Sequence, residues 1–331
     1  MTREALYWRT EGADAVRCEL CPTGCRLRRG RVAPCGSRAN VDGAMLPTQY
    51  GRVVSAGVDP MEKKPLYHFL PGAPILSIAA SGCNLHCQYC QNWNISQCET
   101  GRAETRTPEQ VLALARQHNS CGVAYTYSEP LVWYEFVRDT AERMHAANLK
   151  NVIVSNGFCN EAPLRELLTL IDAANIDLKS MDERFYRRVC KARLEPVLTA
   201  IRLCHELGVH LEVTNLVIPG QNDSDEQIQR LVDFLADLDE SIPLHLSAYR
   251  PAYKFTAPPT SPETLQRAAE LARRKLLYVF VGNVLLDGES DTVCPHCRSR
   301  VIERSGYRTV NRLTAEGACP DCGHRLPVVL E

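Results

Sequence analysis

The chain has 331 residues, of which 45% are hydrophobic and 23% are charged. This is ordinary globular composition, and it excludes a largely disordered chain. Lysine and arginine number 38 against 39 for aspartate and glutamate, so no global charge selects nucleic acid or anionic lipid as a partner. The unusual feature is the count of 16 cysteines.

The first 14 residues, MTREALYWRTEGAD, carry several charges and no apolar run, so we expect no secretory signal peptide and a cytoplasmic location. A stretch without Asp, Glu, Lys or Arg runs from Pro65 to Cys98. Pro71 and Pro74 interrupt it, and its second half is rich in polar residues, so it is not predicted to span a membrane. In a reducing compartment, this many cysteines indicate metal binding or catalysis rather than disulfides.

Apolar runs, several of them rich in β-branched residues, alternate with helix-length segments through the middle of the chain. Helices are predicted to begin after Thr107-Pro108 and to span 225–238 and 262–271, the last of them with Ser261 as its N-cap. Strands separated by helices imply βαβ units and a parallel sheet. The apolar runs predict seven strands, at residues 75–80, 123–127, 151–155, 173–179, 210–218, 242–248 and 276–282.

The predicted fold is therefore α/β, a partial (β/α)6-type TIM-like barrel over residues 72–286. An N-terminal cysteine-rich module is expected at 1–71, and a C-terminal zinc-ribbon-like module at 287–331. In such a barrel, ligands bind at the carboxyl ends of the strands. Catalytic and ligand-binding residues are therefore expected in the loops that follow the strands.

Two cysteine groups lie outside the predicted barrel. The C-terminal group forms two CxxC pairs joined by a hairpin-like stretch, and four thiolates at this spacing favour zinc, which would supply folding free energy. The N-terminal group has enough thiols for a zinc site or an auxiliary iron–sulfur cluster, and its spacing does not decide between them. The C-terminal members are Cys294, Cys297, Cys319 and Cys322, and the N-terminal ones are Cys18, Cys21, Cys25 and Cys35.

Other residues around these groups have plainer interpretations. Arginines near the N-terminal cysteines form a basic patch that either contacts RNA phosphates or is a solvated surface turn without stacking aromatics. These arginines are Arg26, Arg28, Arg29, Arg31 and Arg38. Five scattered cysteines are expected to be small buried hydrophobes, namely Cys98, Cys121, Cys159, Cys190 and Cys204.

The central cysteine group is the motif CNLHCQYC, which places Cys83, Cys87 and Cys90 directly after the first predicted barrel strand. A closed zinc site needs four ligands, so Cys98 or His86 would have to complete one. On a four-iron cube, three thiolates instead leave one iron open to a substrate or cofactor. The uncharged stretch around the trio suits such a cluster, because its reduction potential depends on charge and burial.

The trio, with Tyr89 before its third cysteine, resembles the signature of the radical S-adenosylmethionine (SAM) superfamily. More closely, the chain resembles the radical SAM protein of the AmmeMemoRadiSam system, which is related to the pyruvate formate-lyase activating enzymes. The similarity extends over nearly the whole chain. The segments that carry it are DPMEKKPLYHFLPG, CNLHCQYCQNWNISQ, YTYSEP, NIDLKSMDERFYRRVC, LVIPGQND and VFVGN.

The resemblance implies a [4Fe-4S] cluster on Cys83, Cys87 and Cys90, with an open iron that chelates the amino and carboxylate groups of SAM. One electron from the reduced cluster would cleave the sulfonium to methionine and a 5'-deoxyadenosyl radical, which abstracts hydrogen from a substrate. Cofactor-binding roles are implied for the residues that match the superfamily's site, namely Tyr89, Ser128, Glu129, Ser155, Asn156, Asp177, Lys179 and His245.

Several of these roles have alternatives. Asp177 and Lys179, two apart on one predicted strand, point to the same face, but a surface ion pair would have the same spacing. Glu129 would equally suit a helix N-terminus, and a lone strand histidine such as His245 is often structural. Thr214 and Asn215 stand where the activating enzymes carry an arginine. The resemblance therefore does not say which residue binds the SAM carboxylate at that point.

The expected function is that of a radical SAM oxidoreductase that abstracts hydrogen from a protein, in the manner of glycyl-radical activating enzymes. RNA or a small molecule is the alternative substrate, and a non-catalytic metal-bound scaffold is an alternative of another class. The resemblance also implies a low-potential electron donor such as flavodoxin or ferredoxin, and Memo-type and AMMECR-type proteins as partners. No membrane partner is expected.

Overall fold

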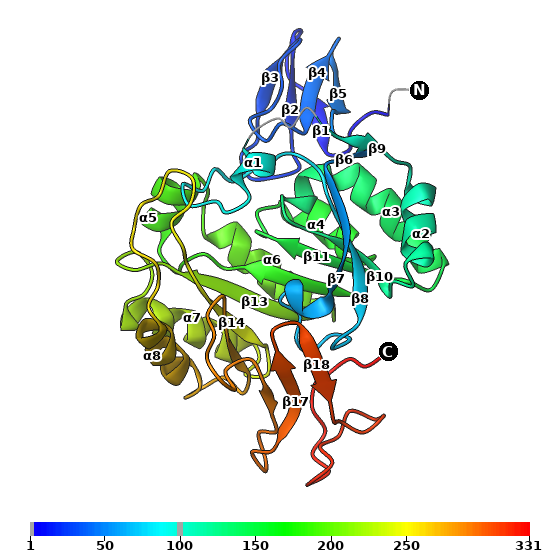
Figure 1. Ribbon diagram of the computed structural model, residues 1–331. Helices are drawn as coiled ribbons and strands as arrows, with labels where there is room; N and C mark the ends of the chain where they lie inside the picture. Colours follow the sequence, from blue (N-terminus) through cyan, green and yellow to red (C-terminus); the bar gives the residue numbers. More distant parts are fainter. Residues whose placement is uncertain (1–2, 98–101) are drawn as a thin grey trace.

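The computed structural model describes residues 3–97 and 102–331. Its centre is an eight-stranded sheet with the order β15-β14-β13-β12-β11-β10-β8-β7 (Figure 1). Neighbouring strands are parallel except β7, which is antiparallel to β8. The strands are β7 (Ser55–Pro60), β8 (Pro74–Ala79), β10 (Gly122–Tyr125), β11 (Lys150–Ser155), β12 (Ala173–Asp177), β13 (His210–Val217), β14 (Leu244–Ala248) and β15 (Val279–Gly282).

Helices connect these strands and pack against the sheet, as α3 does on β11, α6 on β13 and α8 on β14. Three of the longer helices start at a side-chain cap, because Thr107, Ser224 and Ser261 each accept a backbone N–H of the first turn. The longer helices are α2 (Pro108–Gln117), α3 (Tyr134–Ala146), α4 (Glu161–Leu168), α6 (Glu195–Glu206), α7 (Asp225–Leu238) and α8 (Pro262–Ala272). The shorter segments are η1 (Met61–Lys63), α1 (Trp93–Ser96), η2 (Pro130–Trp133), α5 (Glu183–Phe185) and the π-helix η3 (Tyr186–Cys190).

The predicted α/β fold with a parallel sheet is confirmed, and all seven predicted strands are in the sheet. Their ends differ from the predictions by up to three residues. For instance, β15 begins at Val279 rather than 276, because the backbone N–H of Leu277 binds the Glu240 carbonyl instead of a strand. The strand order is linear, with β7 and β15 at its two edges, so the sheet of the described residues is an open, partial barrel.

Strand β7 was not predicted, although it pairs with β8 along its full length. Its sequence, SAGVDP, contains Gly57 and ends in Pro60, and three of its residues are exposed, so it lacks the apolar pattern of the other strands. The central sheet therefore takes one strand from the segment 1–71, which was predicted to form the N-terminal module.

The N-terminal module lies at one end of the barrel, above α1 (Figure 1). It consists of a three-stranded antiparallel sheet and a hairpin. The sheet is β1 (Trp8–Thr10), β2 (Ala15–Cys18) and β3 (Arg26–Arg28), and the hairpin is β4 (Arg38–Val41) with β5 (Ala44–Pro47); a short pair, β6 (Arg52–Val53) and β9 (Glu104–Thr105), follows.

The assignment of Arg38 to the basic surface patch is wrong. Its side chain is 1% exposed and forms an ion pair with Glu135 of α3, which is equally buried. This pair ties the hairpin to the barrel. The four other arginines of the patch are exposed.

The C-terminal module is a small antiparallel sheet of β16 (Thr292–Val293), β17 (Arg300–Ser305) and β18 (Arg308–Asn311). Strands β17 and β18 form the hairpin that was predicted between the two CxxC pairs. The module shares a small core with the barrel, in which Val301 and Ile302 pack with Tyr278 and Phe280.

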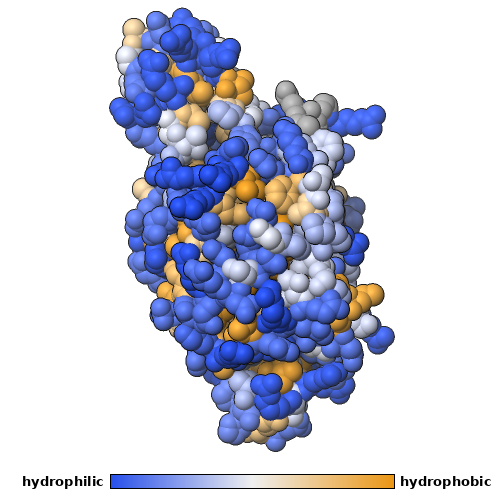
Figure 2. All heavy atoms as spheres, turned by 90° about the vertical axis from the view of Figure 1, so that its left-hand side faces the viewer, coloured by the Kyte–Doolittle hydropathy of each residue, from blue (hydrophilic) through white to orange (hydrophobic). Residues whose placement is uncertain are grey.

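Of the five scattered cysteines, Cys159, Cys190 and Cys204 are buried as predicted, while Cys121 is half-buried. Cys98 lies outside the described residues. Within the described ranges, none of the helices combines the length and the apolar character needed to cross a bilayer. Figure 2 shows a largely hydrophilic face with scattered hydrophobic patches, and the N-terminal module at its top is covered mainly by hydrophilic residues.

Candidate functional site

A cavity of about 320 Å³ opens where the parallel strands end. All three thiols of the central trio line it, together with residues that follow β10, β11, β12 and β15. Cys87 is buried, and Cys83 and Cys90 are half-buried. The structure thus brings the trio to the edge of the sheet where α/β folds bind ligands.

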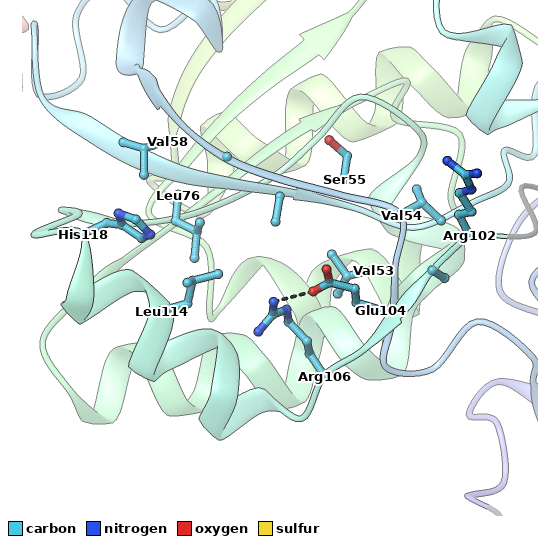
Figure 3. Close-up of a pocket in the computed structure, with 13 residues that line it drawn as sticks. Val53, Val54, Ser55, Val58, Leu76, Arg102, Glu104, Arg106, Leu114 and His118 are labelled. Atoms are coloured by element: carbon cyan, nitrogen blue, oxygen red, sulfur yellow. Dashed lines mark hydrogen bonds and ion pairs between the residues drawn. The ribbon is translucent and has the colours of Figure 1, made fainter.

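A larger hollow of about 800 Å³ runs between the edge strand β7 and α2 (Figure 3). Apolar side chains such as Leu76 and Leu114 line it beside His118. Arg106 and Glu104, which also line it, form an ion pair with each other. None of the described residues that line this hollow is a cysteine, so the smaller cavity is the candidate site.

Gly82 immediately precedes Cys83 in the loop that follows β8. Gly82 has a φ of +107°, and a Cβ atom on it would lie 2.2 Å from the carbonyl oxygen of Cys35 in the N-terminal module. Only glycine fits such a backbone at such a close approach. The Gly82 N–H donates to the Ile95 carbonyl of α1 at 3.0 Å, which folds the loop back over itself.

The sulfur atoms of the trio have polar neighbours. The backbone N–H of Leu85 lies 3.4 Å from the Cys83 sulfur, the side-chain amide of Asn156 lies 3.5 Å from it, and the Cys90 sulfur is 3.1 Å from the Ser96 hydroxyl. Burial raises the pKa of Cys83 well above its usual value, and it raises the pKa of Cys90 as well. A bound metal reverses this preference, because thiols that coordinate a metal are deprotonated.

Glu129 joins two of the loops around the cavity. One carboxylate oxygen accepts the Leu131 N–H at 2.9 Å and the Ser155 hydroxyl at 2.7 Å, and the other accepts the Asn156 N–H at 2.8 Å. Burial raises the pKa of Glu129 to about 7. Glu129 is also the N-cap of η2, and it lines the cavity as well. Because Glu129 binds the backbone N–H of Asn156, it positions the Asn156 side-chain amide that contacts the Cys83 sulfur.

Asp177 and Lys179 form an ion pair of 2.7 Å between Oδ2 and Nζ, and both residues line the cavity. The Lys179 side chain is only 15% exposed, so this is not the surface pair of the alternative interpretation. Burial opposes the charge, but Asp177 and the Cys87 thiol hold the pKa of Lys179 above its usual value. The cavity thus presents one carboxylate and one ammonium close to the trio, which can meet an amino group and a carboxylate.

Two predicted site residues do not line this cavity. Ser155 lies behind it, where it bonds Glu129. His245 is buried on β14, with Nε2 2.6 Å from Glu212, and it lines an adjoining hollow of about 720 Å³ against the C-terminal module. This hollow shares Ser247 and Asn283 with the cavity. The other six, Tyr89, Ser128, Glu129, Asn156, Asp177 and Lys179, all line the cavity.

The two positions that depart from the activating enzymes behave differently. Thr214 lines the cavity, and its hydroxyl donates to Asn175 at 2.9 Å. Asn215 points away, with its amide donating to the Leu178 carbonyl at 2.7 Å. Neither supplies a positive charge to the cavity.

Some cavity residues were not singled out by sequence reasoning, although their segments were. Lys63 lies in DPMEKKPLYHFLPG and Asn283 ends VFVGN, and both line the cavity. Ser247 lines the cavity as well. It lies two residues after His245 on β14, and residues two apart on a strand share a face, so the His245 prediction also pointed to Ser247.

Cys190 has more contact with the trio than its assignment as a core residue suggests. It hydrogen-bonds Cys87, and the Tyr89 hydroxyl lies 3.7 Å from its sulfur. It does not line the cavity. The π-helix that ends at Cys190 also accepts backbone N–H groups of His86 and Gln88 at 2.9 and 3.1 Å, so it supports the trio loop from behind.

The outer cysteine groups differ in geometry. The four C-terminal sulfur atoms all lie within 4.8 Å of one another, with Cys294 3.7 Å from Cys322 and Cys297 3.5 Å from Cys319. In the described part of the chain, this is the one group of three or more metal-ligating side chains that is so compact. The C-terminal group could therefore bind a metal ion.

Comparison with known proteins agrees with the site. Residues 77–235 match the Radical SAM superfamily. The uncharacterized protein MJ0808 of Methanocaldococcus jannaschii is 40% identical over 335 residues, which cover 99% of this chain and 100% of that protein. Pyruvate formate-lyase 1-activating enzyme of Escherichia coli is 25% identical over 51% of this chain and 71% of its own length. The 4-hydroxyphenylacetate decarboxylase activating enzyme of Clostridium scatologenes is 26% identical over 44% of this chain and 48% of its own.

Solved structures share the fold. Streptococcus suis SuiB bound to S-adenosylmethionine superposes with a TM-score of 0.51 at 17% identity, over 63% of this chain and 52% of SuiB. A structure of TYW1 with a lysine-pyruvate adduct gives a TM-score of 0.50 at 16% identity, over 71% of this chain and 87% of that one. The match therefore spans about half of SuiB and most of TYW1.

Proposed function

This chain belongs to the radical SAM superfamily, and from that premise we propose that Cys83, Cys87 and Cys90 hold a [4Fe-4S] cluster that binds SAM beside it. The observation that carries the proposal is that three thiols line one cavity with an ion pair. The donor set fits the group, because three thiolates leave one iron open and Cys190, which hydrogen-bonds Cys87, stays outside the cavity.

When bound, such a cluster supplies the electron that cleaves SAM to methionine and a 5'-deoxyadenosyl radical. The residues of this chain hold and orient the reactants. Asn156 and the Leu85 N–H bond the Cys83 sulfur, and hydrogen bonds to cluster sulfurs tune the potential. Lys179 and Asp177 would receive the carboxylate and amino groups of SAM. Glu129 acts through Asn156 and is a positioning residue.

We further propose that the substrate is a protein. The similarity to two activating enzymes, of pyruvate formate-lyase and of 4-hydroxyphenylacetate decarboxylase, supports this choice. RNA or a small molecule remains the alternative substrate class. A low-potential donor such as flavodoxin or ferredoxin would supply the electron, and Memo-type and AMMECR-type proteins are proposed partners.

The C-terminal group is proposed to bind zinc. Four sulfurs within 4.8 Å suit a single ion, because Zn–S bonds of about 2.3 Å place tetrahedral sulfurs roughly 3.8 Å apart. The metal would join β16 to the segment after β18, and it would stabilise a module too small to build a core alone.

The proposal is tested by anaerobic reconstitution with iron and sulfide, followed by dithionite and SAM. We expect 5'-deoxyadenosine and methionine from the wild type and from the variant Cys204→Ala, since Cys204 is buried on α6 and does not line the cavity. Cys87→Ala should form neither product. Product formation that persists in Cys87→Ala, or its absence from the wild type, would sink the proposal.

The substrate class is tested with the same assay. Purified candidate proteins, including Memo-type and AMMECR-type proteins, and total RNA are added separately, and SAM cleavage is measured. Stimulation by a protein but not by RNA supports the protein substrate. Stimulation by RNA alone would replace it with the alternative.

A further inference from the structure

The N-terminal cysteine group, Cys18, Cys21, Cys25 and Cys35, has no role in the proposed chemistry, yet it is built like a metal site. Cys18 ends β2 and Cys25 directly precedes β3, and the Cys18 N–H donates to the Cys25 carbonyl at 2.9 Å. Cys21 lies in the turn between the two strands. All four thiols are free and none is exposed, so burial leaves them without the hydration that thiols in water have.

The four thiols lie near one another, because those of Cys21, Cys18 and Cys25 all interact electrostatically with the Cys35 thiol. Backbone N–H groups of Leu20 and Ser37 bond the sulfurs of Cys18 and Cys35. Converging thiols with N–H donors aimed at their sulfurs are the usual surroundings of a metal-bound thiolate.

A buried cation completes these surroundings. The Arg38 guanidinium is 1% exposed, and its Nη1 atom lies 3.8 Å from the Cys18 sulfur. The same Nη1 atom donates to the Leu6 carbonyl and Nη2 donates to Glu135, but Nε has no partner although it is buried. A positive charge held against sulfur stabilises thiolates and the negative charge of a reduced cluster.

The distances between the sulfur atoms favour a cluster over a single metal ion in the N-terminal group. The C-terminal group gathers all four sulfurs within 4.8 Å, as one tetrahedral ion requires. Among these four described residues, no three sulfurs of the N-terminal group meet that limit. Cysteines on the corners of a four-iron cube lie further apart than ligands of one ion, since the irons themselves are spread over the cube.

The group also lies against the central trio. The Cys35 carbonyl abuts the Cα of Gly82, which precedes Cys83. On another side, the Cys159 thiol donates to the Leu20 carbonyl at 3.2 Å. The loop that ends at Cys159 begins with Asn156, whose amide reaches Cys83. One loop therefore contacts both cysteine groups.

We propose that Cys18, Cys21, Cys25 and Cys35 hold a second [4Fe-4S] cluster, which passes one electron to the central cluster. A reduced one-electron carrier, such as a flavodoxin or a ferredoxin, loses one electron to the second cluster, which then loses it to the central cluster; no proton or bond changes at either step. The exposed Arg26, Arg28, Arg29 and Arg31 around the group would attract an acidic carrier. The electron path rests on the proposed function of the trio, whereas the second metal site does not.

The site is tested with the triple variant Cys83→Ala/Cys87→Ala/Cys90→Ala, reconstituted anaerobically beside the wild type and Cys204→Ala. We expect the triple variant to keep about half of the wild-type iron and sulfide and to show the electron paramagnetic resonance signal of a reduced [4Fe-4S] cluster. Loss of all iron, with two zinc ions per chain, would overturn the site. That result leaves the proposed function untouched, which fails only if the wild type does not cleave SAM.

The electron path is tested with Cys21→Ala/Cys25→Ala, which leaves the trio intact. With dithionite, a small reductant that reaches the central cluster directly, SAM cleavage should stay within about twofold of the wild type. With reduced flavodoxin it should fall about tenfold or more. An unchanged rate with flavodoxin, or an equal loss with both reductants, would overturn the path.

Discussion

Gly82→Ala tests whether the fit between the N-terminal module and the trio loop is as tight as the structure indicates. The new Cβ would lie 2.2 Å from the Cys35 carbonyl oxygen and 3.0 Å from the Ser37 hydroxyl. Both partners belong to the module. The Ser37 hydroxyl can rotate away, but the Cys35 carbonyl is backbone and cannot. The φ of +107° adds backbone strain for any residue with a Cβ.

The size of the effect follows from these two causes. A side chain in a sparsely populated backbone region costs about 1–3 kcal/mol, and forcing an extra carbon into packed surroundings costs a further 1–3 kcal/mol or so. We therefore expect Gly82→Ala to lower the free energy of unfolding by about 2–6 kcal/mol. Because Cys83 is the next residue, reconstituted iron and SAM cleavage should fall as well.

The matched control is Gly208→Ala, in the turn after α6. Gly208 has a φ of +71°, and no other atom lies within 4 Å of the point where a Cβ on it would stand. This variant carries the left-handed cost of about 1–2 kcal/mol without the clash. Urea unfolding under nitrogen, iron content and 5'-deoxyadenosine formation are measured for both variants. If Gly82→Ala is no more destabilised than Gly208→Ala and keeps its iron, the close contact with Cys35 is refuted.

Three further predictions concern the cavity, a buried histidine and the C-terminal module. Lys179→Met should raise the KM for SAM about tenfold or more, because a buried charge-assisted contact is lost, whereas Lys275→Met, which breaks an exposed pair with an aspartate, should leave the KM unchanged. Burial lowers the pKa of His68 to about 3. Below pH 6.5 the unfolded chain therefore binds a proton at His68 that the folded chain does not bind. Wild-type stability should therefore fall by roughly 1.4 kcal/mol per pH unit from pH 6.5 towards 3 through this group, and His68→Gln should show a shallower fall in acid unfolding; equal slopes would contradict this. Cys319→Ala should release one zinc ion and lower the melting temperature while the iron content stays, and unchanged zinc would refute the C-terminal site.

The strands of the barrel could be predicted because each carries its own signal. Their apolar runs are buried on both faces, as in β10, where all four residues are buried. Strand β7 could not be predicted, because it depends on its partner. Half of it is exposed, and it is held by the edge of β8 rather than by a hydrophobic pattern.

The site divides in the same way. The trio is local in sequence and its spacing singled it out, whereas Asp177 and Lys179 were singled out by the resemblance to the superfamily's site. Contacts between distant segments carried no such signal. Arg38 was placed in a surface patch because it is close in sequence to four other arginines, but its partner Glu135 lies 97 residues away. Cys190 looked like any buried cysteine until the π-helix put it behind Cys87, 103 residues earlier in the chain.

The two outer cysteine groups show why spacing alone does not decide which metal is bound. In the C-terminal group one CxxC pair lies between β16 and β17 and the other follows β18. The module thus carries all four sulfurs on neighbouring segments of its own. In the N-terminal group, Cys18 and Cys25 flank one turn, but Cys35 comes from a loop whose carbonyl rests against Gly82 of the barrel. Its position is set by packing between the module and the trio loop, which no count of intervening residues encodes.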